Sequence, residues 1–189
     1  MTPSTRHRLG ELIDGLAGLP YGGEAVDQRT HALQTAWYAA QAEADDELIL
    51  AAALHDIGRA DPIRAAYPDL PHELAGAAFA ERHVGTRAAW LIAQHVPAKR
   101  YLVATDPEYR DLLSPVSVRS LARQGGPMDA HEVAQFEAHP MASDAARLRR
   151  WDDAAKDPRG PELSLDDVLA AYDRVAATSS GAATSATSP

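Results

Sequence analysis

One short segment constrains the fold of this chain more than any other. Residues 48–57 read LILAAALHDI, so a helix over residues 46–57 would be apolar on nearly every side. A helix without a polar face is stable only when other elements surround it. Because burying an unpaired carboxylate is costly, His55 and Asp56 at the end of this helix need a partner. That partner is a helix-end salt bridge, a hydrogen-bond network or a metal ion.

The remainder of the chain is also patterned as helices. Runs of β-branched residues are few, and no stretch alternates polar and apolar residues with a period of two. We predict an all-α fold, a single helical bundle, with helices over residues 5–17, 29–43, 46–57, 72–83, 86–95, 107–113, 116–123, 130–138, 143–156 and 164–177. The domain is expected to span residues 1–177, followed by a disordered tail of small, polar residues over 178–189.

Composition argues against several classes of function. A chain of 189 residues is long enough for one domain with a sizeable core. It has no cysteine, which removes thiolate zinc sites, iron–sulfur clusters and cysteine nucleophiles and leaves nitrogen and oxygen side chains as strong metal ligands. The formal charge of −9 argues against nucleic acid as a partner. Without a long apolar run or a signal-peptide core, the expected protein is cytoplasmic and has no membrane partner.

Three further histidines lie where a core is expected. His31 opens an amphipathic helix, His95 shares the apolar stripe of its own helix, and His72 lies in the first turn of another. Each of them alone is more often a satisfied core or capping residue than a ligand. Together, imidazoles at inward-facing positions around a buried His-Asp pair favour a metal centre.

The predicted helix over residues 143–156 supplies a second inward carboxylate. Its apolar stripe includes Asp152 and excludes Asp153, and Arg149 lies three residues before Asp152 on the same face. We therefore expect Asp152 and Arg149 in the interior. Arg150, Asp153 and Lys156 are expected on the solvated face of the helix.

The order of these residues resembles the HD-domain superfamily, an all-α fold named after the adjacent His and Asp. Within it, the chain is most similar to the PhnZ-like mixed-valent diiron oxygenases of organophosphonate catabolism, and more distantly to myo-inositol oxygenase. The resemblance covers about residues 18–156 and is carried by YGGE (21–24), THALQ (30–34), LHDIG (54–58), HVPAKRYL (95–102), Leu113-Ser114 with Ser117, SLARQGG (120–126) and LRRWDD (148–153). The HD pair alone is a weak signal, whereas HD followed in order by the last three long motifs is a strong one.

The resemblance implies a two-iron site with six protein ligands. One iron would be held by His31, His55, Asp56 and Asp152. Asp56 would bridge to a second iron, completed by His72 and His95. His83 competes with His72 for the sixth position.

The resemblance also implies a phosphonate-binding set and a mobile pair. The phosphonate would be gripped by four polar residues, Lys99, Ser117, Gln124 and Arg149. Tyr21 and Glu24 correspond to a pair in which the tyrosine occupies an open iron position until substrate displaces it. Tyr21, Glu24 and Lys99 are therefore the expected catalytic residues, and Glu24 is also expected to contact the substrate.

The reaction implied by the resemblance is oxidative cleavage of a C–P bond in a small-molecule phosphonate. The expected substrate is a 1-hydroxy-2-aminoethylphosphonate with a free or N-methylated amine, and the expected products are inorganic phosphate and glycine or an N-methylated glycine. The implied cofactors are two iron ions, Fe(II) and Fe(III), with O2 as co-substrate. Two alternatives stay open: an HD-type metal-dependent phosphohydrolase of a phosphate ester or nucleotide, and a non-catalytic regulator that binds a phosphorylated ligand. The oligomeric state is open as well, and a monomer is compatible with the sequence.

One position departs from the family pattern. The motif HDIGR carries Arg59 where a family representative has histidine, four residues after the first motif histidine. Arginine is always charged and cannot act as a neutral proton acceptor. We expect Arg59 on the substrate side, paired with Glu24 or in contact with an anionic group of the substrate; a solvent-facing Arg59 is the alternative. The substituent of the substrate is therefore left open.

Overall fold

The elements of this chain are helices, as predicted. The computed structural model describes residues 4–185, and within them the only pairing of extended backbone is an isolated bridge between Pro20 and Asp27. The helices are α1 (Thr5–Asp14), α2 (Gln28–Gln41), α3 (Asp46–Leu54), α4 (Asp61–Ala66), α5 (His72–His83), α6 (Thr86–Thr105), α7 (Pro107–Leu112), α8 (Pro115–Arg123), α9 (Ala130–Glu137), α10 (Ala142–Ala154) and α11 (Leu165–Ser185), with a 3-10 turn, η1 (Ile57–Arg59), after α3.

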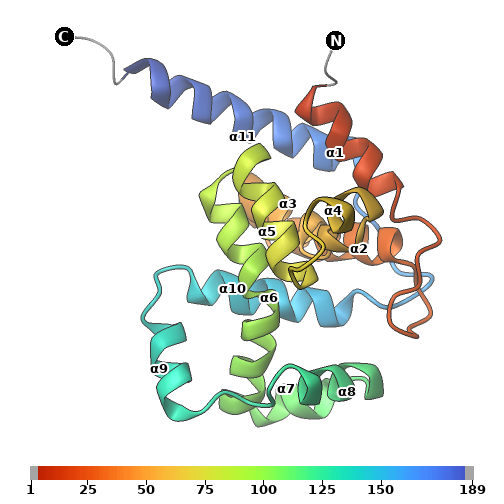
Figure 1. Cartoon of the computed structure of the whole chain (residues 1–189), viewed down its shortest axis with the longest axis vertical. Helices are drawn as coiled ribbons and strands as arrows, with labels where there is room; N and C mark the ends of the chain where they lie inside the picture. Colours follow the sequence, from red (N-terminus) through yellow and green to blue (C-terminus); the bar gives the residue numbers. More distant parts are fainter. Residues whose placement is uncertain (1–3, 186–189) are drawn as a thin grey trace.

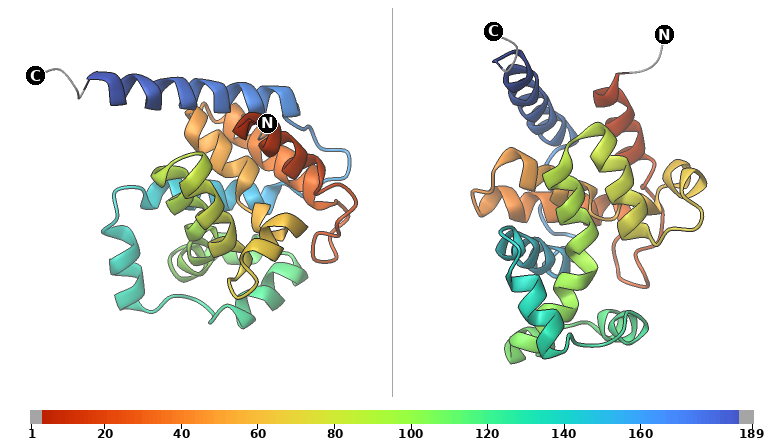
Figure 2. Two further views of the ribbon diagram at one scale, coloured as in Figure 1. Left: turned by 45° about the horizontal axis from the view of Figure 1, so that its top comes forward. Right: turned by 60° about the vertical axis from the view of Figure 1, so that its left-hand side comes forward.

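The apolar helix α3 lies at the centre of the bundle. It packs against α2, α6, α10 and α11, and its side chains Leu48, Leu50 and Leu54 are buried. Asp45 caps the helix by accepting a hydrogen bond from the Leu48 amide, and acidic residues fill the first turn, where they complement the helix dipole. In Figures 1 and 2, α11 crosses one side of the bundle with α1 beside it. The central position predicted from the LILAAAL run is confirmed.

The long helix α6 connects this core to a second, smaller one. Its first half packs against α5, α10 and α3, and its last turns reach α7 at the opposite end of the molecule, near α8 (Figure 1). There Leu102, Val103, Tyr109 and Leu121 form a separate buried cluster. The helix thus spans both the region around α3 and the region that carries the SLARQGG motif.

The largest differences from the sequence prediction concern three helices. We expected a helix over 86–95 that ends before Pro97, but α6 continues through Pro97 to Thr105 because buried contacts on both sides of the proline outweigh one lost backbone hydrogen bond. The short helix α4, with Pro62 in its first turn, was not predicted. α11 passes residue 177, the predicted end of the domain, and continues to Ser185. Residues 186–189 of the predicted tail lie outside the described residues.

None of the helices in the described part of the chain combines the length and apolarity that a membrane span requires.

Candidate metal centre and substrate cavity

Three buried side chains from three helices meet beside the end of α3. The Nε2 atom of His31 on α2 lies 3.0 Å from the Nε2 atom of His55 and 3.3 Å from Oδ1 of Asp152 on α10. The distance from His55 Nε2 to Asp152 Oδ2 is 3.8 Å. We call these three residues the inner group. Each is at most 2% exposed, so the centre of the bundle contains two imidazoles and a carboxylate.

A second set, the outer group, consists of His72 at the start of α5 and His95 on α6. Their Nε2 atoms are 3.2 Å apart. Asp56 Oδ1 lies 3.0 Å from His72 Nε2 and 3.7 Å from His95 Nε2. His83, the alternative to His72, is at the other end of the twelve-residue helix α5, roughly 16 Å along its axis, and contacts Phe79 instead.

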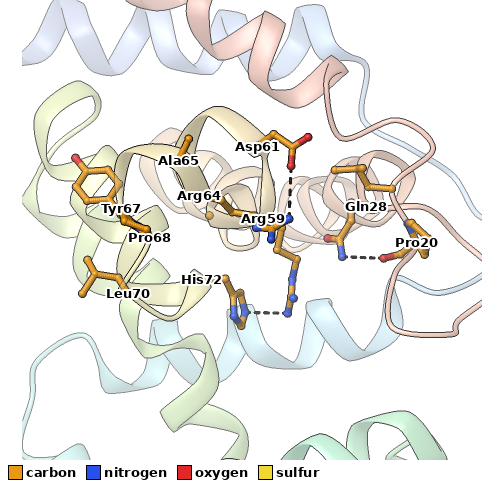
Figure 3. Close-up of a pocket in the computed structure, with 12 residues that line it drawn as sticks. Pro20, Gln28, Arg59, Asp61, Arg64, Ala65, Tyr67, Pro68, Leu70 and His72 are labelled. Carbon is orange, nitrogen blue, oxygen red and sulfur yellow. Dashed lines mark hydrogen bonds and ion pairs between the residues drawn. The ribbon is translucent and has the colours of Figure 1, made fainter.

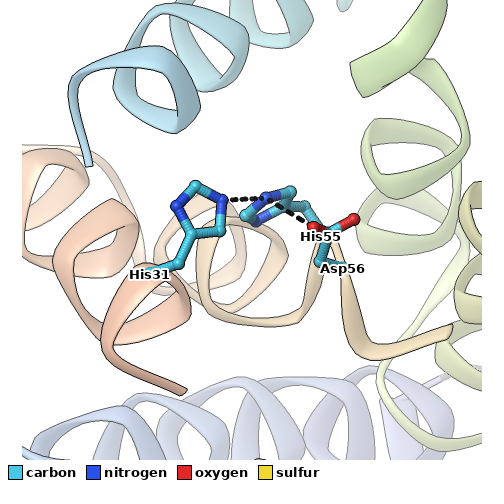
Figure 4. A group of neighbouring side chains, drawn as sticks. All are labelled: His31, His55 and Asp56. Atoms are coloured by element: carbon cyan, nitrogen blue, oxygen red, sulfur yellow. Dashed lines mark hydrogen bonds and ion pairs between the residues drawn. The ribbon is translucent and has the colours of Figure 1, made fainter. Parts of the chain in front are cut away.

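Asp56 stands between the two groups. Its Oδ1 atom faces the outer group, and its Oδ2 atom lies 4.0 Å from His55 Nε2 (Figure 4). Oδ1 is buried and accepts no hydrogen bond. His31, His55 and Asp56 offer ligand atoms close enough to hold one metal ion, and Asp56, His72 and His95 offer a second such set. A carboxylate with one oxygen toward each set has the arrangement of a bridging ligand.

The outer nitrogen of every one of these imidazoles is tied to an acceptor. The Nδ1 atoms of His31, His55 and His95 lie 2.7–2.8 Å from the carbonyl oxygens of Ala155, Ala52 and Ile92. The Nδ1 atom of His72 lies 3.0 Å from Oε2 of Glu73. With Nδ1 as donor, a neutral imidazole presents a bare Nε2 lone pair. Two such lone pairs, on His31 and His55 at 3.0 Å, repel each other unless a cation or a proton lies between them, so this donor set fits a metal ion. The Nε2 atoms of His72 and His95, 3.2 Å apart, can share a proton when no metal ion is bound.

A glycine in the HDIG motif allows the outer group to approach. A Cβ atom on Gly58 would lie 1.9 Å from the carbonyl oxygen of His72 and 2.9 Å from the backbone nitrogen of Gly76. Any side chain at this position would push α5 away from η1. The glycine therefore sets the distance between Asp56 and His72, a role that the sequence analysis did not assign.

Electrostatics favour ionised carboxylates and a neutral His95. Burial opposes ionisation of Asp56, but Arg59 and His72 hold the pKa of its carboxyl well below the ordinary value. Burial likewise opposes ionisation of Asp152, and Arg149 with His55 keeps its pKa well below the ordinary value. Burial and the nearby imidazoles lower the pKa of His95 to about 3.

His72 differs from the other three histidines. Burial lowers its pKa, but Asp56 and Glu73 on either side of the ring raise the pKa to about 9. Without a metal ion, His72 therefore carries a proton at neutral pH. A metal ion at this position must displace that proton.

Tyr21 covers the inner group. Its hydroxyl donates a hydrogen bond to Asp152 Oδ1 (2.9 Å), and its ring stacks on His31 with the centroids 3.7 Å apart. The loop reaches this position through Gly22 and Gly23, whose φ angles of 59° and 99° are unfavourable for other residues. Glu24 accepts a hydrogen bond from the Ser114 hydroxyl at 2.6 Å. The YGGE motif thus closes over the centre from the side of α8.

A cavity of about 350 Å³ opens beside the two groups. All the predicted substrate-binding residues line it: Glu24, Arg59, Lys99, Ser117, Gln124 and Arg149. Among its ionisable walls, cationic side chains outnumber carboxylates, the former being Arg59, Lys99, Arg123, Arg149 and Lys156 and the latter Glu24, Asp56 and Asp152. The cavity is therefore suited to an anion, although the whole chain carries a charge of −9.

Lys99 and Gln124 both line this cavity. The Lys99 amine is buried and donates to the Ser120 hydroxyl at 2.7 Å. Burial and the nearby Arg149 lower the pKa of Lys99 to about 8. The Oε1 atom of Gln124 is buried and has no hydrogen-bond partner in the described structure, and Gly125 and Gly126, at φ angles of 99° and 74°, turn the chain directly after it.

Asp153 and Lys156 are not on a solvated face, so that expectation is wrong. Arg149 binds both Asp153 oxygens, with Nε–Oδ2 and Nη2–Oδ1 distances of 2.8 and 2.6 Å, while its Nη1 atom lies 2.7 Å from Asp152. Lys156 donates to Asp153 at 3.0 Å and to Ser117 at 3.1 Å, and Tyr109 also donates to Asp153. The four-residue spacing from Arg149 to Asp153, which puts both on one helix face, was the signal that could have shown this.

Arg59 lines the cavity, but it does not pair with Glu24. Its Nε atom lies 3.0 Å from Asp56 Oδ2, and its Nη2 atom lies 3.0 Å from His72 Nε2 (Figure 3). The side chain is 41% exposed and reaches the edge of the cavity. The side chain is therefore partly exposed to solvent, while its Nε atom is buried beside Asp56.

Comparison with known proteins gives the chain close relatives. No model of a protein family matches it. It is 40% identical over 153 residues to the 1-hydroxy-2-(trimethylamino)ethyl phosphonate dioxygenase (glycine-betaine-forming) of Leisingera caerulea, covering 78% of either chain. It is 41% identical over 145 residues to the hydroxymethylphosphonate dioxygenase of Gimesia maris, covering 74% of this chain and 72% of the relative.

A third relative extends the group to a virus. An uncharacterised protein of Acanthamoeba polyphaga mimivirus is 34% identical over 152 residues, which cover 77% of this chain and 69% of the viral protein. The identity to the two enzymes extends over about three quarters of the chain, as the resemblance seen in the sequence does. The chain therefore belongs to the family of these phosphonate dioxygenases.

Proposed function

We propose that this chain is a diiron oxygenase that cleaves the C–P bond of a 1-hydroxyalkylphosphonate. One O2 and one substrate would give inorganic phosphate and a carboxylic acid that keeps the carbon chain. This reaction balances without an external reductant, since the four electrons that reduce O2 come from the carbon that is oxidised. With a 1-hydroxy-2-aminoethylphosphonate, the acid would be glycine or an N-methylated glycine.

The observation that carries this proposal is the position of Asp56. It lies between two groups of imidazoles and beside a cavity with cationic walls, in a chain whose relatives are phosphonate dioxygenases. The inner group with Asp56 would hold one iron, and Asp56 with the outer group would hold the other. A mixed-valent pair of iron ions supplies the binding of O2 and the oxidation of the substrate carbon, which side chains cannot perform.

The protein's own contribution is to position and neutralise the phosphonate. Lys99 offers a cation, and Arg149 offers a planar fork whose orientation Asp153 fixes. Ser117 and Gln124 complete the set, and the unpaired Oε1 atom of Gln124 could accept a hydrogen bond from a hydroxyl group of the ligand. Substrate that enters the cavity would displace the Tyr21 hydroxyl from Asp152, while Glu24 stays near the reacting carbon.

Parallel measurement of oxygen and phosphate tests this function. The chain would be reconstituted with iron under anaerobic conditions and given hydroxymethylphosphonate or a 1-hydroxy-2-aminoethylphosphonate. We expect one phosphate released for each O2 consumed, and none under argon. Phosphate release at an equal rate under argon would instead identify a phosphohydrolase, and ligand binding without phosphate release would identify a regulator.

A further inference from the structure

Two adjacent hollows share a wall near the outer group. The cavity described above and an open groove of about 850 Å³ are both lined by Pro20, Gln28, Arg59 and His72. The rest of the groove is formed by α4 and by the loop that leads into α5 (Figure 3). If Lys99 and Arg149 hold the phosphonate of a ligand, the other end of a longer ligand would extend toward this wall.

Arg59 is the cation that a growing ligand would meet. The two charged side chains of α4 that line the groove, Asp61 and Arg64, form an exposed ion pair at 3.5 Å and compensate each other. Arg59 faces Asp56, but its Nε atom makes no well-aligned hydrogen bond, although it is buried. Asp56 also faces both groups of imidazoles, so its charge is shared and does not satisfy Arg59 alone.

Gln28 adds a polar group on the same wall. The residue is 3% exposed, and its Oε1 atom is buried without a hydrogen-bond partner in the described structure. Its amide nitrogen reaches only Pro20, at 3.4 Å. Buried polar groups without partners are rare in a folded protein and indicate a ligand or ordered water. Oε1 only accepts hydrogen bonds, so the partner that it lacks is a donor, such as an O–H or N–H group of a ligand or a water molecule. The charge of an anionic group at this wall would be met by Arg59, which lines the same two hollows.

We propose that the groove receives the substituent on the hydroxylated carbon of the substrate, and that Arg59 selects a carboxylate there. This inference rests on the proposed function and names its substrate class: 1-hydroxyphosphonates with an anionic substituent. A quaternary ammonium group, which the name of the Leisingera caerulea relative includes, would place one cation against another in this chain. Repulsion between these two like charges would disfavour binding.

Equilibrium binding separates charge selection from catalysis. Three phosphonates without the reactive hydroxyl would be titrated into the anaerobic, iron-loaded protein: 2-carboxyethylphosphonate, propylphosphonate and 2-(trimethylamino)ethylphosphonate. We expect the carboxylate to bind roughly tenfold more tightly than the neutral propyl compound, with the ammonium compound weakest. In Arg59→Gln the three dissociation constants should converge, and Arg59→Lys should keep part of the preference.

Arg64→Gln is the matched control, because it removes a cation from the same groove that already has a partner. It should leave the order of affinities unchanged. Equal affinities in the native protein would overturn the proposal. A carboxylate preference that survives Arg59→Gln would overturn it too, since the carboxylate would then be held by iron or by another side chain.

Hydroxymethylphosphonate keeps this test distinct from that of the reaction, because it has no substituent to reach Arg59. If it yields no oxygen-dependent phosphate while the carboxylate preference holds, the proposed reaction fails and the groove assignment stands. If phosphate is released but the carboxylate preference is absent, the groove assignment fails and the proposed reaction stands.

Discussion

The inner and outer groups of the centre hold similar side chains in different surroundings. His31, His55 and Asp152 are enclosed by α2, α3 and α10, whereas His72 is 19% exposed and borders both the cavity and the groove. The three fully buried histidines are oriented by backbone carbonyls, but His72 is oriented by the side chain of Glu73. The two histidines of the inner group are therefore positioned by backbone carbonyls, whereas the outer group depends in part on His72, which one replaceable side chain orients.

The largest effect is expected where the two groups meet. Asp56→Ala would remove the carboxylate shared by both, so we expect loss of both iron ions and of phosphate production. Iron content after anaerobic reconstitution, measured beside phosphate release, tests this. His83→Gln is the control, because His83 lies at the far end of α5 and should keep both ions. An Asp56→Ala protein that retains two irons would show that Asp56 is not a bridge.

A methyl group at position 58 should affect iron binding by the outer group and leave iron binding by the inner group intact. Gly58→Ala would push the start of α5 away from η1, so we expect retention of the inner iron, loss of the outer one, and about 2 kcal/mol less stability from overpacking. Iron stoichiometry and urea denaturation measure the two effects. Gly10→Ala is the matched control, since its new Cβ would meet only Leu169 at an ordinary 3.5 Å. Equal loss of both ions would show that the inner and outer groups do not bind iron independently.

A smaller change is expected from Glu73. Glu73→Gln removes the charged acceptor of His72 Nδ1 while keeping the size of the side chain. Loss of such a partner typically weakens metal binding roughly 10–100-fold. Competition with a metal chelator should show this loss for one of the two ions only. Glu81→Gln, on the same helix but away from the site, should have no effect; weakening of both ions in Glu73→Gln would argue against independent groups.

The mildest prediction concerns pH and the cavity that the two groups share. Because the pKa of Lys99 is lowered to about 8, its charge is lost as the pH rises through that value. We expect kcat/KM for a phosphonate to be highest below pH 8 and to fall up to tenfold per pH unit above it. Lys99→Arg should remove the fall, since arginine stays charged, and Lys99→Met should be slow at every pH. An unchanged alkaline limb in Lys99→Arg would assign the fall to another group.

The buried candidate ligands His55, His95 and Asp152 were more accessible to sequence reasoning than their surroundings were. The apolar run before His55, and the helical spacing of Asp152 and His95, depend on local periodicity, which a sequence displays directly. The inward positions of His31 and His72 were also inferred from helix patterns, and the resemblance to HD-domain oxygenases supplied the division of the ligands between two iron ions. The structure brings these side chains together. Their roles as iron ligands stay predictions that the experiments above test.

What the sequence did not reveal depends on contacts between distant segments. Pro97 predicted a helix end, but packing on both sides of it keeps α6 intact. Asp153 was assigned to solvent because one helix stripe was taken as the only buried face, whereas α8 and Tyr109 of α7 cover a second face. The close approach of Gly58 in η1 to the His72 carbonyl at the start of α5 joins two separate segments, and no local pattern encodes it.

The continuity of α6 has a consequence for the length of the substrate. His95 and Lys99 are four residues apart on one unbroken helix, which places them about 6 Å apart along its axis. In the proposed function, with His95 on iron and Lys99 on the phosphonate, the distance between these two residues would therefore be fixed by the rise of α6. A hinge motion elsewhere in the molecule would move both residues together. This part of the site could not be lengthened to admit a larger substrate. The additional atoms of such a substrate would have to lie at the opposite end, where α4 and Arg59 form the boundary.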